Sequence, residues 1–319
     1  MKSRTTRVTT ALLLLAFGAC ARAEAPAPPA TPPATLVAEA KSPNGTLFFP
    51  RQIAAEKRTQ LEADLAAAQR AYDAAPDNAD SIIWLGRRLG YLERFQDAIR
   101  AFTKGIAKHP DDARLYRFRG HRYINVREFD NAIADLSRAE KLITGQTDTP
   151  EPDGAPNKLG IPTSTQHGNI FYHLALAHYL KADYAASLKS WDEAFRIATN
   201  DDTRVAVNDW RYMTLRRLGR ATDANALLNS VNKSLKIFEN TAYFRRMLLY
   251  KGELPADSLL SQGETDPLQY VTQGYGVGNW YLANGDSTKA FEIFRKVTNS
   301  GYWAAFGFIA AEADIARGK

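Results

Sequence analysis

The stretch that decides the fold spans residues 79–112 and reads ADSIIWLGRRLGYLERFQDAIRAFTKGIAKHPDD. Small and large apolar residues alternate in it at fixed spacings, and Gly86 is followed twelve positions later by Ala98. This spacing places a small side chain where two consecutive helices must approach closely. The stretch therefore predicts two helices joined by a short turn, with Pro110 closing the unit.

The same pattern returns with a period near 34 residues. Gly120 and Ala132 repeat the twelve-residue step, and it recurs from Ala175 to Ser187 and from Gly278 to Ala290. Copies are expected to start near residues 79, 113, 168, 205, 239 and 271, and the copy at 239–261 is the most degenerate because Pro255 delays its second helix. Self-similarity at this period indicates an array of stacked helix pairs.

The pattern resembles the tetratricopeptide repeat over residues 79–300. The resemblance implies an all-α, right-handed superhelix whose first helices line a concave face, and we find no convincing strand signal. Pro76-Asp77-Asn78, Pro110-Asp111-Asp112 and Asn200-Asp201-Asp202 should supply helix N-caps. Within residues 47–78, a helix at 51–75 should pack on the first repeat, and within residues 301–319 a helix at 302–317 should cap the array.

Residues 1–23 have the pattern of an export signal. Lys2, Arg4 and Arg7 precede a short apolar run at 11–17, and small residues follow at 18–23. Two cleavage sites remain open. One is the small-x-small site at 21–23, which leaves a soluble chain, and the other places Cys20 at the mature N-terminus as the lipid-bearing residue of a bacterial lipoprotein.

Cys20 is the only cysteine in the chain, so it has no disulfide partner. The lipoprotein box departs from its usual form because Phe17 stands where Leu is common, and Ala21 after the cysteine would favour the outer membrane. The Pro- and Ala-rich residues 24–46 are expected to act as an extended linker. The expected location is the periplasm, with a possible outer-membrane anchor.

Charge and composition exclude several classes of protein. The chain has 319 residues, 45% hydrophobic and 24% charged, which suits a folded body. Of its 41 basic residues three lie in the export signal, leaving at most 38 against 35 acidic residues. This near-neutral balance argues against a nucleic-acid partner.

The first helices should expose an aromatic and basic lining on the concave face. Trp, Tyr and Arg dominate interface hot spots, although partial exposure and helix packing also account for them. Ile83, Arg114, Asn169 and Asp209 belong to the same expected face. The candidate groove residues are Trp84, Arg87, Arg117, Phe118, His121, Tyr172, His173, Trp210, Met213 and Arg217.

These residues favour a protein or peptide partner in extended form, with apolar groups for the aromatic rings and carboxylates for the arginines. The Lys, Asn and Arg clamp that some tetratricopeptide proteins use for a C-terminal carboxylate does not match here. Residues 145–167, rich in Pro and Gly, interrupt the array. We expect disorder there, and the alternative is a lid over the groove.

No motif for catalysis, nucleotide binding or metal binding is present, so neither a catalytic residue nor a cofactor is expected. A metal between His121 and His173 is disfavoured because no third ligand is evident. The leading hypothesis is a non-enzymatic scaffold in the bacterial envelope. The alternatives are an all-α enzyme such as a carbohydrate-active hydrolase, for which Asp209 is the clearest acid, and a self-assembling structural subunit. The oligomeric state stays open.

Overall fold

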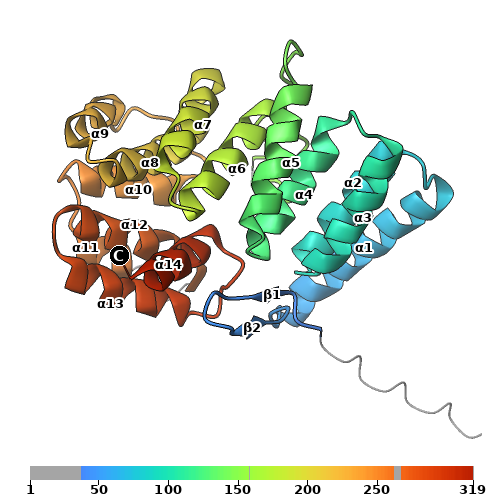
Figure 1. Cartoon of the computed structure of the whole chain (residues 1–319), viewed down its shortest axis with the longest axis horizontal. Coiled ribbons are helices and arrows are strands. Elements are labelled where there is room, and N and C mark those ends of the chain that lie inside the picture. The colour runs from blue at the N-terminus through green and yellow to red at the C-terminus, as the bar shows by residue number, and fades with distance from the viewer. Residues whose placement is uncertain (1–36, 158, 262–266, 319) are drawn as a thin grey trace, which may run out of the picture. The chain divides into compact units, whose positions relative to one another are not determined.

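The computed structural model describes residues 37–157, 159–261 and 267–318, which form antiparallel helix pairs packed one after another (Figure 1). The expected export signal at 1–23, with Cys20, lies outside the described residues, as do residues 24–36 of the expected linker. Among the described residues, no helix combines the length and the apolar character that crossing a membrane requires.

The described elements begin with a short hairpin and continue as helices to the end of the chain. In chain order they are β1 (Ala40–Lys41), β2 (Leu47–Phe48), α1 (Ala55–Ala74), α2 (Ala79–Tyr91), α3 (Phe95–Lys108), α4 (Ala113–Asn125), α5 (Phe129–Leu142), α6 (Gln166–Leu180), α7 (Tyr184–Ile197), α8 (Asp201–Arg217), α9 (Ala221–Leu227), a 3-10 turn η1 (Leu228–Ser230), α10 (Thr241–Tyr250), α11 (Ala256–Leu260), α12 (Pro267–Ala283), α13 (Ser287–Thr298) and α14 (Phe306–Arg317).

The expected all-α architecture of stacked helix-turn-helix units is confirmed. Six pairs follow one another from α2–α3 to α12–α13, and neighbouring helices pack closely. The expected caps are present: the side chains of Asn78, Asp112 and Asn200 accept backbone N–H groups at 3.0, 3.0 and 2.9 Å. Each cap satisfies a donor that the first helical turn leaves free.

The small residues of the repeat allow the two helices of a pair to touch. A Cβ atom at Gly86 would lie 2.4 Å from the ring of Phe102, and one at Gly120 would lie 2.7 Å from Leu136. No real side chain fits at such distances, so α2 packs directly on the Phe102 ring and α4 on Leu136. The twelve-residue step in the sequence reflects this close contact.

All six pairs use the same turn. In each, a residue with positive φ ends the first helix, and the next backbone N–H donates to the carbonyl five residues earlier, as in a Schellman motif. The degenerate repeat at 239–261 keeps this turn at Gly252. Three of the six positions are not glycine, which is uncommon for this conformation. The positive-φ residues are Glu93, Arg127, Ala182, Gly219, Gly252 and Gly285.

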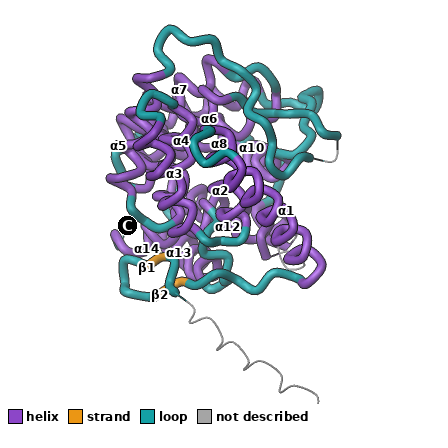
Figure 2. The backbone as a smooth tube through the Cα atoms, turned by 90° about the vertical axis from the view of Figure 1, so that its right-hand side faces the viewer, coloured by secondary structure: helices purple, strands orange, loops and turns teal. Residues whose placement is uncertain are grey.

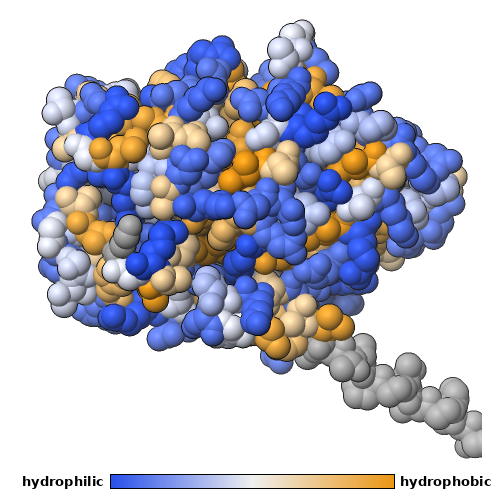
Figure 3. All heavy atoms as spheres, in the orientation of Figure 1, coloured by the Kyte–Doolittle hydropathy of each residue, from blue (hydrophilic) through white to orange (hydrophobic). Residues whose placement is uncertain are grey.

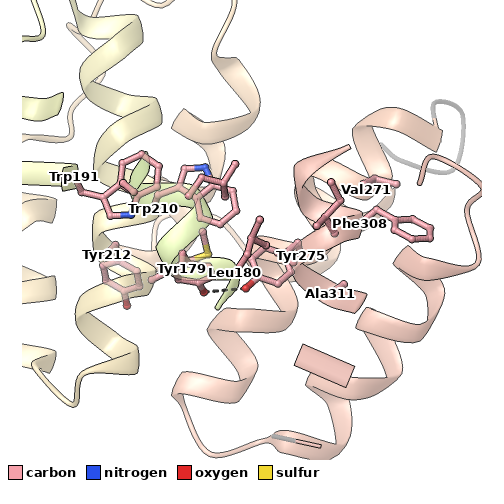
Figure 4. Close-up of a cluster of buried hydrophobic side chains, with 14 of the residues drawn as sticks. Tyr179, Leu180, Trp191, Trp210, Tyr212, Val271, Tyr275, Phe308 and Ala311 are labelled. Atoms are coloured by element: carbon pink, nitrogen blue, oxygen red, sulfur yellow. Dashed lines mark hydrogen bonds between the residues drawn. The ribbon is translucent and has the colours of Figure 1, made fainter. Parts of the chain in front are cut away.

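A column of stacked aromatic rings forms the centre of the core (Figure 4). Trp191 of α7 lies 6.0 Å from Trp210 of α8, measured between ring centroids. Trp210 lies 5.8 Å from Tyr275 of α12, which lies 5.4 Å from Phe294 of α13. The column connects the third and fourth helix pairs with the sixth, which is distant from them in sequence.

The C-terminal helix does more than cap the last pair. It packs against α12 and α13 and also against α6. Arg127, in the turn after α4, donates from Nε to Glu312 at 2.9 Å and from Nη2 to the Trp303 carbonyl at 2.9 Å. Asn125 donates to the Ala304 carbonyl at 3.0 Å. The end of the chain is thus fastened to the middle of the array.

The first described residues of the chain form a β-hairpin that the sequence did not predict. β1 pairs antiparallel with β2, and residues 37–46, expected to be linker, are part of this structure. Phe48 stacks on Trp303 at 5.3 Å, and Trp303 Nε1 donates to the Phe49 carbonyl at 2.8 Å. Figure 2 shows the strands in orange beside α13 and α14, and Figure 3 shows apolar atoms around the hairpin, where Val37 and Leu47 are exposed.

The helix before the first repeat begins later than expected, at Ala55 rather than at residue 51, and packs on α2. The residues before it cross to the first turn, where the Arg51 amide donates to the Glu93 carboxylate at 2.8 Å and Arg51 Nη2 lies 2.5 Å from it. Glu93 is one of the positive-φ residues. The unusual backbone therefore aims a carboxylate at the N-terminal segment.

Candidate functional site

Three adjoining cavities lie along the face formed by the first helices α2, α4, α6 and α8. Their volumes are about 280, 210 and 160 Å³, and all three are lined by Arg87 of α2 and by Glu151. Seven of the ten candidate groove residues line these cavities, which places them on one face. The seven are Trp84, Arg87, Arg117, Phe118, His121, Tyr172 and His173.

The inserted segment crosses this face. We call residues 147–164 the strap. The two ends of the strap lie side by side. Pro150 forms a β-bridge with Thr165, the residue directly after the strap, and the Glu151 amide donates to the Ser164 carbonyl at 3.1 Å. The expected disorder is wrong for the described residues of the strap, because backbone and side-chain bonds fix them on both sides of the face.

The strap is held on one side by α2 and α4. Arg88 donates to the Gly154 carbonyl at 3.0 Å, and Arg117 pairs with Glu151 at 3.0 Å. A Cβ atom at Gly154 would lie 2.0 Å from the Tyr91 hydroxyl, so the backbone of the strap lies directly on that side chain. A side chain at this position would therefore displace the Tyr91 hydroxyl.

On the other side the strap reaches α8 and the start of α10. Asn200 and Thr203 donate to the Thr163 carbonyl at 2.7 and 2.5 Å. Asn157 donates to the Glu239 carboxylate at 3.1 Å, and Thr163 also donates to it. The strap therefore spans the concave face from the first repeat to the fifth.

Three arginines surround the 210 Å³ cavity beneath the strap. Arg117 is 7% exposed and has Glu151 as its carboxylate partner, yet its Nε has no hydrogen-bond partner among the described residues. Among the described residues, the Arg122 guanidinium has one hydrogen-bond partner, the His121 ring. Its Nη2 donates to His121 Nδ1 at 3.0 Å. Burial lowers the pKa of Arg122 to about 9, and the charge of Arg117 contributes.

The third arginine, Arg87, forms no hydrogen bond or ion pair with the described residues. Its guanidinium lies over the rings of Trp84 at 4.4 Å and Phe118 at 4.9 Å. Such stacking stabilises a cation but satisfies none of its N–H donors. The cavity therefore holds more guanidinium charge than its carboxylates neutralise, with Glu151 the one carboxylate paired to an arginine there.

His121 lines this cavity and His173 the neighbouring 280 Å³ cavity, and their rings contact each other at a tilt of 40°, with ring centroids 4.3 Å apart. Phe306 of α14 packs against both rings, at 5.4 and 5.8 Å. Burial, with the nearby arginine charges, lowers the pKa of both histidines well below the usual value. Both are therefore neutral at neutral pH, and His173 Nδ1 donates to the Asn169 carbonyl at 2.6 Å.

Trp84 and Tyr172 occupy the two ends of the lining. Trp84 is half-buried, with the guanidinium groups of Arg87 and Arg88 4.4 and 5.2 Å from its ring. Tyr172 lines the 280 Å³ cavity, and its ring is edge-on to Trp191 at 4.8 Å. The Tyr172 ring packs against the core on one side and borders a cavity on the other, whereas Trp84 borders two cavities.

The expectation that Trp210, Met213 and Asp209 are exposed on the concave face is wrong. Trp210 and Met213 are each 1% exposed, and Asp209 is fully buried against Arg246 of α10. The cause is the return of the C-terminal helices, since Tyr275 of α12 covers the Trp210 ring. In an array without the returning C-terminal helices, this face of α8 would be open.

Arg217 is likewise part of the structural core. Its Nε donates to Asn279 of α12 at 2.9 Å and its Nη2 to Asp314 of α14 at 2.6 Å. Asp314 also accepts the Tyr275 hydroxyl at 3.0 Å. This network joins α8, α12 and α14.

Five other residues expected on the concave face do lie there but are buried rather than exposed. They are Ile83, Arg87, Arg117, Phe118 and His173.

Sequence reasoning missed three carboxylates that line the 280 Å³ cavity: Glu151, Asp153 and Glu239. Each already accepts a bond, from Arg117, from the Ala155 amide and from Asn157, respectively. Glu151 and Glu239 connect the strap to the repeats, whereas the bond of Asp153 lies within the strap. Among the described residues no group of three or more histidine, cysteine or acidic side chains is placed to bind a metal.

Comparison with known proteins finds no matching family model and no matching curated protein. Solved structures with a similar arrangement of helices do exist. A tetratricopeptide repeat protein from Parabacteroides merdae is 13% identical, with a TM-score of 0.46 over 82% of this chain and 94% of that one. MamA is 16% identical, with a TM-score of 0.43 over 64% and 99%. YrrB, described as a TPR protein with an unusual peptide-binding site, is 16% identical, with a TM-score of 0.41 over 73% and 92%. In its own helix pairs, caps and turns, the chain is a tetratricopeptide-like array.

Proposed function

We propose that the protein is a non-enzymatic scaffold that holds an extended segment of a partner protein on its concave face. The observation that carries the proposal is the composition of the cavities on that face. Aromatic rings and guanidinium groups from successive first helices line connected spaces, and Arg87 keeps all its N–H donors free among the described residues. Aromatic and arginine side chains of this kind anchor protein partners.

The export signal supports a place in the bacterial cell envelope. Residues 1–23 fit the pattern, and Cys20 fits a lipid anchor that the linker would separate from the array. We propose a periplasmic location with this anchor at the outer membrane. A Cys20→Ser variant tests the anchor: the protein should move from the membrane fraction to the soluble fraction, and an unchanged distribution would favour cleavage at 21–23.

Site-specific photo-crosslinking tests the binding face. A photoreactive phenylalanine at position 84 should yield a discrete adduct whose mapped contact is an extended segment of the partner. The same group at Lys104, an exposed residue of α3, is the control and should yield none. Equal labelling at both positions, or none at position 84, would remove the support for a concave binding face.

A further inference from the structure

We propose that strap residues 150–154 occupy the concave face as a built-in substitute for the partner, and that the partner is an extended acidic segment that displaces them. This inference rests on the proposed scaffold function and adds to it the chemistry of the partner and the state of the free protein.

The strap contacts the face as a bound peptide would. One acidic side chain, Glu151, pairs with Arg117, and one main-chain carbonyl, that of Gly154, accepts from Arg88. Between them Pro152 and Asp153 are exposed. Pairing of a carboxylate with arginine and of a peptide carbonyl with a side-chain donor would be equally available to another chain of the same composition.

The strap leaves the charge of the cavity unbalanced. Glu151 partners Arg117, but Arg87 and Arg122 have no carboxylate partner among the described residues, and the Nε of Arg117 has no acceptor there. A buried N–H group without an acceptor, such as the Arg117 Nε, is costly. A partner that brings two acidic side chains would satisfy more of these donors than Glu151 does. Electrostatic attraction therefore favours exchange of the strap for such a partner.

The strap can leave without unfolding the repeats. Residues 150–154 contact side chains of α2 and α4, and they also pair through their backbone with Ser164 and Thr165. The neighbouring Thr163 is held separately by Asn200 and Thr203, through its carbonyl, so this end stays in place when residues 150–154 move away. The helix pairs keep their own caps and turns. Only the segment that covers the arginines must move.

A peptide with the strap's own sequence provides the probe. A labelled peptide of residues 148–156, DTPEPDGAP, is titrated with the full-length protein, and binding is followed by fluorescence anisotropy. Wild type should bind weakly because the strap occupies the site, and this occupancy reduces the apparent affinity by the fraction of open protein. Glu151→Gln removes the charge that holds the strap on Arg117 and should tighten binding about tenfold, which corresponds to about 1.4 kcal/mol.

Three controls make the result specific. Asp153→Asn removes the same charge two residues away without breaking the arginine pair, and should leave the affinity within about twofold of wild type, since no ion pair is lost. Gly154→Ala loosens the strap by a different contact, the one with Tyr91, and should tighten binding in the same direction as Glu151→Gln. Arg117→Met in the Glu151→Gln background should abolish binding, as should a peptide whose glutamate and aspartates are replaced by their amides.

Equal affinity in wild type, Glu151→Gln and Gly154→Ala would overturn the inference, and so would binding that is indifferent to the peptide's acidic groups. This failure is distinguishable from failure of the scaffold function. An adduct at position 84 together with strap-independent binding would retain the scaffold and reject the strap as a substitute, whereas absence of any adduct would reject the scaffold itself.

Discussion

Replacement of Trp210 by alanine separates a core role from a groove role. The Trp210 ring is 1% exposed and stacks between Trp191 and Tyr275, with centroid distances of 6.0 and 5.8 Å. Removing a buried tryptophan leaves a cavity and typically costs about 3–5 kcal/mol. Trp210→Ala should therefore lower the melting temperature by roughly 10 °C, at about 2–4 °C per kcal/mol for a chain of this size.

Trp84→Ala is the matched comparison. Trp84 is half-buried and borders a cavity, so its loss should cost only about 1 kcal/mol, as for most single substitutions. Both variants are measured by thermal and urea denaturation followed by circular dichroism. Trp210→Phe should recover part of the stability because a ring still fills the column. If Trp210→Ala is as stable as Trp84→Ala, the ring is not in the core and the account of the C-terminal closure is wrong.

Three further predictions concern stability. Arg127→Met should cost about 3–5 kcal/mol, because it leaves Glu312 of α14 unpaired. Hydrogen exchange should then rise across α14, and unchanged exchange would contradict the role of Arg127 in holding that helix. His173→Gln should reduce the loss of stability in acid: the folded pKa of His173 lies below its unfolded value, so stability is full above pH ~6.5 and falls below it as the unfolded chain binds protons. Equal slopes of unfolding free energy against pH in variant and wild type would refute this. Gly86→Ala should cost roughly 1–3 kcal/mol because its Cβ meets the Phe102 ring, and Phe102→Leu should restore part of that, whereas additive losses would count against the close contact.

The sequence predicted the repeats because their signals are local. A small residue such as Gly86 and a cap such as Asn78 act within one helix pair, so the spacing alone places them. The turns were harder to foresee at Glu93 and Arg127, since a non-glycine residue in the left-handed region has no compositional signature. At both positions the side chain contacts a segment that is distant in sequence: Glu93 pairs with Arg51, and Arg127 pairs with Glu312.

Long-range closure accounts for most of the errors at the site. Trp210 and Arg217 occupy repeat positions that are exposed in an open array, and only the return of α12 and α14 buries or pairs them. The period of a repeat holds no information on such a return. The strap was misjudged for a related reason: Pro- and Gly-rich composition resembles disorder, but Glu151 and Gly154 find fixed partners on α2 and α4.

The pairing of the strap with the concave face is the central claim, and hydrogen exchange of the Glu151 amide tests it most directly. This amide donates to the Ser164 carbonyl at 3.1 Å in the free protein, so it should be protected. Saturating acidic peptide should release that protection while the amides of α2 and α4 keep theirs. A Glu151 amide that stays protected when peptide is bound, or that exchanges freely without it, would contradict the account.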